Sequence, residues 1–64
     1  MNKYYVVQRD FGSPDISVFE IKAPNKNEAW EIVEKEISRT MSQEWLFDAQ
    51  EYNDFKAQLS KVNP

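Results

Sequence analysis

The sequence predicts a small α+β domain with the element order β-β-α-β-α: a β-hairpin, a helix, a short third strand and a C-terminal helix. Three observations predict this fold. Residues 3–9 and 16–23 are rich in β-branched and aromatic residues, which favour strands. Apolar residues then recur at helical spacing, and capping patterns at Asn25 and Asp48 mark where two helices begin. We expect residues 1–64 to form one domain, because so short a chain holds a single hydrophobic core.

The loop of the hairpin is predicted at residues 10–15, which read DFGSPD. This segment contains the only glycine of the chain, Gly12, and also Pro14, so we expect a loop longer than a two-residue turn. If Val6 pairs with Phe19, side chains alternate so that one face of the sheet carries Tyr4, Val6, Phe19 and Ile21. The opposite face then carries Tyr5, Val7, Arg9, Ile16, Val18 and Glu20.

The first helix is predicted over residues 25–40, NKNEAWEIVEKEISRT, after Pro24 has ended the second strand. Asn25 is followed three positions later by Glu28, which is the spacing of a capping box. Trp30 lies at the border of the apolar arc and is expected to be partly exposed. The whole arc, which we expect to face the sheet, consists of Ala29, Trp30, Val33, Ile37 and Met41.

The third strand is predicted at residues 44–47, EWLF. Alternation places Trp45 and Phe47 on one face of this strand, and we expect Trp45 to anchor the core. The competing interpretation is a single helix that begins with a Ser42 cap and continues through Val62, since the composition of this segment also favours a helix.

The last helix is predicted to begin after Asp48. Asp48 and Glu51 have the spacing of a second capping box, and Phe47 and Tyr52 have the spacing of a hydrophobic staple. The helix then continues through an apolar repeat at Tyr52, Phe55, Leu59 and Val62.

Several chemical functions are disfavoured by composition. The chain has no histidine and no cysteine, the usual ligands of zinc and most transition metals, so we expect no metal site. One glycine is too few for a loop that cradles phosphates, so no nucleotide cofactor is expected. Carboxylates mostly fall on outward helix faces or at caps, where they stay solvated. We therefore expect a protein that is not an enzyme and has no catalytic residues.

Location is predicted from the lack of targeting signals in the sequence. The start of the chain, MNKYYVVQRD, has no extended apolar core of the kind found in secretory signals. No run approaches the roughly 20 apolar residues that cross a bilayer. We expect a soluble, cytoplasmic protein.

The expected function is protein binding. If both helices cover one face of the sheet, the other face is left with apolar residues inside a charged rim, which is typical of an interface. The alternative is that the second helix crosses over and covers that face. We expect an adaptor or inhibitor that binds a protein partner or a second copy of itself, as small bacterial and phage accessory proteins do. The candidate partner-binding residues are Tyr5, Val7, Arg9, Val18, Glu20 and Trp30.

A function linked to nucleic acid is the alternative expectation. Residues 3–9, KYYVVQR, interleave aromatic and basic side chains as single-strand binding surfaces do. An acidic mimic of nucleic acid could instead use Glu28, Glu31, Glu34 and Glu51. The net charge of −3 disfavours direct binding, because contacts to phosphates require an excess of Lys and Arg. A structural subunit without separate activity is a third option.

Overall fold

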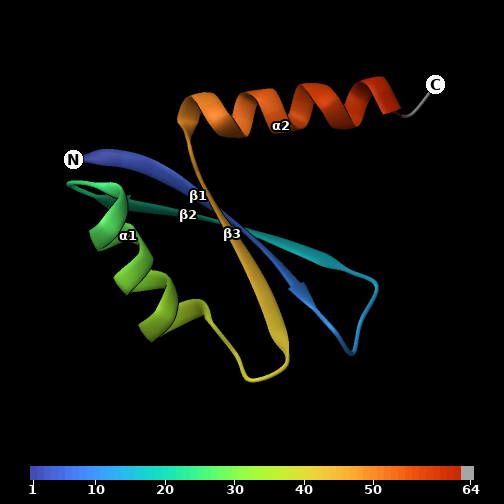
Figure 1. Cartoon of the computed structure of the whole chain (residues 1–64), viewed down its shortest axis with the longest axis horizontal. Coiled ribbons are helices and arrows are strands. Elements are labelled where there is room, and N and C mark those ends of the chain that lie inside the picture. The colour runs from blue at the N-terminus through green and yellow to red at the C-terminus, as the bar shows by residue number, and fades with distance from the viewer. Residues whose placement is uncertain (63–64) are drawn as a thin grey trace.

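The fold is the predicted α+β domain, and its elements follow the predicted order. The computed structural model describes the backbone of residues 1–62 and the side chains of residues 1–58. Strands β1 (Asn2–Asp10) and β2 (Ile16–Ala23) form the hairpin, and helix α1 (Lys26–Ile32) runs on into a π-helical turn, η1 (Val33–Ile37). Strand β3 (Ser42–Asp48) leads directly into helix α2 (Ala49–Val62). Figure 1 shows the two helices on opposite sides of the sheet.

The sheet is antiparallel and has the strand order β2-β1-β3. The predicted register is confirmed, because Val6 pairs with Phe19 and Val7 with Val18. On the other side of β1, Val7 pairs with Trp45. The central strand is therefore β1, and the two outer strands are the edges of the sheet.

The core lies between α1 and one face of the sheet. Tyr4 and Val6 from β1 and Leu46 from β3 are buried there against Ala29 and Val33. Ile21, Ile32 and Ile37 pack against the same cluster. Among the side chains of residues 1–58, the largest that are fully enclosed are Val6 and Val33, so this core is small.

The first helix begins as predicted and ends earlier than predicted. Asn25 caps it, since its Oδ1 accepts a hydrogen bond of 2.9 Å from the backbone N–H of Glu28. The helical structure stops at Ile37 and does not reach residue 40, because the backbone of Ser38 turns to an extended conformation. The buried side chain of Gln8 donates a 2.7 Å hydrogen bond to the carbonyl of Ile37 and ties this end to the sheet. Met41 consequently lies outside the helix and is exposed, which corrects its predicted place in the apolar arc.

The third strand is longer than predicted and the single-helix interpretation is wrong. Strand β3 spans Ser42–Asp48, and α2 starts at the next residue. Both halves of the capping box form: Asp48 Oδ1 accepts from the Glu51 N–H at 2.7 Å, and Glu51 Oε1 accepts from the Asp48 N–H at 3.0 Å. The side chains of Leu59 and Val62, the predicted continuation of the apolar repeat, lie outside the described residues.

Candidate functional site

Helix α2 lies on the sheet face opposite α1, and aromatic stacking holds its first turns there. The ring of Tyr52 stacks on Tyr5 of β1 with 4.3 Å between centroids. The ring of Phe55 stacks on Phe47 of β3 with 5.1 Å between centroids. Phe47 therefore stacks on Phe55, one turn beyond Tyr52, the partner that the predicted staple assigned to it. The interpretation in which the second helix crosses to the other face is the correct one.

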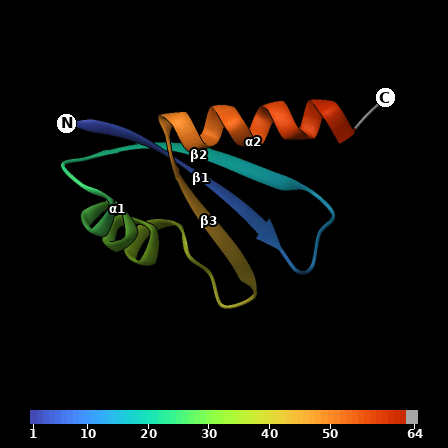
Figure 2. The same ribbon diagram turned by 45° about the horizontal axis from the view of Figure 1, so that its top comes forward.

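This helix covers only one end of that face. Figures 1 and 2 show that α2 starts beside the end of β3, and in Figure 1 the rest of the helix diverges from the strands, which run at an angle to it. The hairpin end of the face is left open. Its apolar side chains are substantially exposed, with 60% of Ile16, 49% of Val18 and 38% of Trp45 accessible to solvent.

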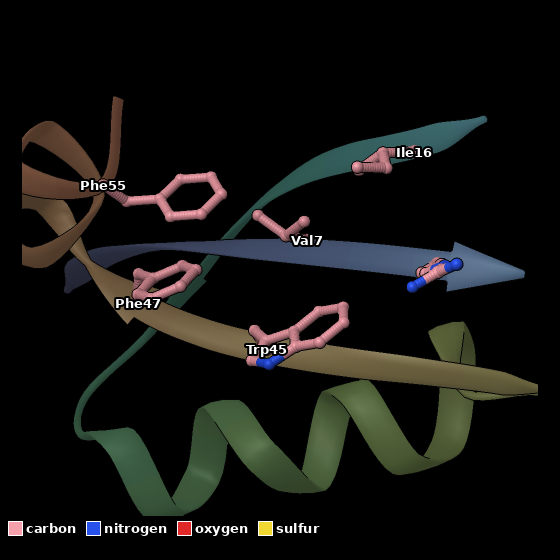
Figure 3. Close-up of a pocket in the computed structure, with 6 residues that line it drawn as sticks. Val7, Ile16, Trp45, Phe47 and Phe55 are labelled. Carbon is pink, nitrogen blue, oxygen red and sulfur yellow. The ribbon is translucent and has the colours of Figure 1, made fainter. Parts of the chain in front are cut away.

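A groove of about 290 Å³ lies between α2 and the open end of the sheet. Val7 forms its floor and is only 3% exposed, because its neighbours on both adjacent strands surround it. Phe55 and Phe47 enclose one end, and Ile16 and Trp45 flank Val7 toward the other, as Figure 3 shows. Arg9 completes the lining. The groove is therefore apolar apart from one guanidinium group, which is the usual character of a site that binds apolar groups and orients them by one polar contact.

The charges around this face are unequal at its two ends. Lys3 and Glu20 form an ion pair of 3.3 Å at the end next to α2. At the hairpin end, Arg9 is exposed and has no ion-pair partner among residues 1–58. A positive charge beside an apolar groove favours a ligand that carries a carboxylate next to its apolar part.

The structure brings together some of the predicted partner-binding residues and separates others. Val7 and Arg9 line the groove, and Val18 lies beside it on β2. Tyr5 is half-buried under Tyr52, and Glu20 is engaged by Lys3. Trp30 is exposed as predicted but belongs to α1, on the other side of the sheet.

Four groove residues were absent from the predicted set: Ile16, Trp45, Phe47 and Phe55. The expected role of Trp45 as a core anchor is wrong, since Trp45 shares the open face with Val7 and not the α1 face with Val6. The signal was present in the alternation of residues 44–47, which places Trp45 and Phe47 on one face. Alternation does not specify how β3 pairs with β1, and this pairing decides which face of the sheet Trp45 and Phe47 share.

Glu44 belongs to a partly buried hydrogen-bond network that lies outside the groove lining. Glu44 accepts a 3.0 Å hydrogen bond from Gln8 and another from the Ser42 hydroxyl. Burial alone would raise the pKa of Glu44, but the hydrogen bonds from Ser42, Gln8 and Ser38 outweigh it and lower the pKa. Glu44 is thus held ionised near neutral pH, which suits a structural acceptor and not a proton donor.

Two other properties of the described residues bear on function. Their carboxylates form no group of three or more that could hold a metal ion. Their helices are too short and too polar to cross a membrane. Comparison of the chain with protein-family models, curated proteins and solved structures finds no match.

Proposed function

We propose that this protein is a non-enzymatic binding module, of the adaptor or inhibitor type, that holds a segment of another protein in the groove beneath α2. The observation that carries the proposal is the groove itself. A domain with so few enclosed side chains leaves Ile16, Val18 and Trp45 partly in water around it. Exposed apolar surface costs about 25 cal/mol per Å² relative to burial, so a partner that covers it gains binding energy.

The chemistry of the lining indicates what the partner segment carries. Aromatic walls at Trp45, Phe47 and Phe55 suit an aromatic or branched aliphatic side chain. Arg9 can pair with a carboxylate two or three residues away from that side chain. The proposed ligand is therefore a short segment in which an apolar residue is close to Asp or Glu.

Selection from a random peptide library tests this proposal, because it requires no candidate for the natural partner. Peptides selected on the wild-type protein should combine an apolar anchor with an acidic residue, and should shift the NMR signals of Val7, Ile16 and Trp45 on binding. The Arg9→Glu variant should select peptides without the acidic residue. Arg39→Glu is the matched control, since Arg39 is an exposed arginine outside the groove lining, 3.9 Å from Asp10. Peptides that bind elsewhere, or an acidic preference that survives Arg9→Glu, would refute the proposal.

A further inference from the structure

We propose that a second copy of the chain pairs with β2 along its free edge, antiparallel and about a two-fold axis, so that two three-stranded sheets become one. This inference goes beyond the groove and does not depend on it. It concerns the backbone edge of the sheet, whereas the groove lies on a face.

The direction of the backbone groups on β2 follows from two hydrogen bonds elsewhere. The N–H of Phe11 donates to the carbonyl of Met41. Because backbone groups alternate along a strand, the N–H and C=O groups of odd-numbered residues in β1 point toward β3, and those of even-numbered residues point toward β2. On β3, Asp48 pairs with the even-numbered Tyr4, so its N–H should point away from β1, and it does donate to Glu51 and not to β1. The register then assigns the odd-numbered residues of β2 to β1 and points the N–H and C=O groups of its even-numbered residues outward: Ile16, Val18, Glu20 and Lys22.

The side chains of β2 are exposed on both faces of the sheet. Val18 is 49% exposed on the face of the groove, and Phe19 is 37% exposed on the face of α1. A partner docked on either face alone would leave the other side chain in water. A strand added beside β2 in the plane of the sheet would cover both.

Strand β2 also lacks the features that normally prevent edge pairing. It contains no proline, and its register with β1 runs without a bulge from Ile16 to Ala23. Its two charged residues, Glu20 and Lys22, lie in the half away from the hairpin loop. Residues 16–19, Ile-Ser-Val-Phe, thus form an unprotected edge.

The other edge of the sheet is better closed. On β3, the outward N–H of Asp48 is satisfied within the chain by the Glu51 carboxylate. The backbone groups of Leu46 point to the free edge of β3, but the residue as a whole is buried and its side chain lies in the core. At the other end of β3 the Ser42 hydroxyl accepts from the N–H of Arg39 and holds the preceding loop against the strand. Pairing is therefore directed to β2.

The monomer is more extended than a compact protein of its mass, so a large share of its surface is open to a partner. A monomeric protein of 7.6 kDa is expected to expose about 4,300 Å², whereas this chain exposes 4929 Å². A compact domain of 64 residues has a radius of gyration of about 10.7 Å, and the value here is 12.4 Å.

A second copy fits this edge for reasons of symmetry and charge. Two-fold antiparallel pairing always sets even-numbered residues opposite even-numbered ones, so outward groups meet outward groups. In a register centred on Val18, Glu20 lies opposite Ile16 of the second copy, and in one centred on Phe19 it lies opposite Val18. Neither register places like charges opposite each other. Because the core is small, covering the β2 edge would add stability to a monomer that already folds, and a second copy is present wherever the chain is made.

Hydrogen exchange of the wild-type protein at several concentrations tests the pairing without any substitution. In the monomer, the N–H of Phe19 is bonded to β1 and protected, while those of Val18 and Glu20 exchange freely. On dimer formation, hydrogen exchange at the backbone N–H groups of Val18 and Glu20 should slow by at least about tenfold. Sedimentation measures the association in the same samples. A protein that stays monomeric at millimolar concentration overturns the proposal, as does a dimer in which Val18 and Glu20 remain unprotected.

The Val18→Pro variant provides a second test. Proline removes the outward N–H and leaves the bonds to β1 intact, and edge strands tolerate it. We expect a folded monomer by circular dichroism and sedimentation. Arg9→Glu is the control, because it changes the groove but should leave the dimer unchanged, so failure of one proposal is distinguished from failure of the other. A Val18→Pro protein that dimerises like the wild type refutes the edge pairing, and if this variant does not fold, hydrogen exchange of the wild type decides.

Discussion

The junction between β3 and α2 can be tested through the capping box, because one residue carries half of it. Asp48→Ala removes the acceptor of the 2.7 Å hydrogen bond from the Glu51 N–H and leaves that N–H without a partner in the chain. The other half persists, since the Asp48 N–H still donates to the Glu51 carboxylate. The bonds are exposed to solvent, so water replaces part of what is lost. We therefore expect a loss of about 1 kcal/mol in the free energy of unfolding, within the range of N-cap substitutions.

Urea denaturation followed by circular dichroism measures this loss directly. In a domain of this size, 1 kcal/mol corresponds to a decrease of about 4–8 °C in Tm. Asp48→Asn keeps a side-chain acceptor and should recover most of the stability. Asp15→Ala is the control in the hairpin loop, where alanine should have almost no effect. If Asp48→Ala is as stable as the wild type, the cap does not determine where α2 begins, and the reasoning used to divide strand from helix is wrong.

Three further predictions concern the buried polar network, the core and nucleic acid. The pKa of Glu44 is lowered in the fold, so its carboxylate stabilises the fold above its ordinary pKa and loses this effect as the pH falls through the lowered pKa. Glu44→Gln should therefore be less stable than the wild type at pH 7. Urea denaturation at several pH values should show that this difference in the free energy of unfolding vanishes in acid. Val33→Ala should cost about 2–3 kcal/mol in denaturation, against less than about 1 kcal/mol for Val18→Ala, because only Val33 is fully enclosed. No binding to single- or double-stranded DNA is expected in fluorescence titrations at physiological salt, and micromolar, salt-sensitive binding would favour the nucleic-acid alternative.

The parts of the fold that sequence patterns predicted are those set by neighbouring residues. The register of the hairpin followed from alternation on both strands, and Val6 does pair with Phe19. The starts of both helices followed from side-chain acceptors at Asn25 and Asp48, each of which binds the N–H three residues later. A helix cap involves only residues within one turn of each other, so the sequence of that turn is enough to predict where the helix begins.

The parts that sequence patterns missed depend on contacts between distant segments. The helix after Asn25 ends at Ile37, where the carbonyl is bonded by Gln8 from 29 positions away. Trp45 faces the groove because β3 pairs with β1, which no local pattern specifies. For the same reason the composition of the groove could not be predicted: its lining comes from four different elements.

The open edge and the open groove have one structural origin. A sheet of three strands is narrow, and the shortest extent of the molecule is 13 Å. The α1 helix packs on one face, and α2 is joined to β3 at one end of the other, while Ile16 and Val18 near the hairpin loop stay exposed. Adding strands beside β2 would widen the sheet but would leave the space beneath α2 unfilled. A dimer joined at the β2 edges would therefore still present two grooves, one on each copy, and could hold two partner segments at once.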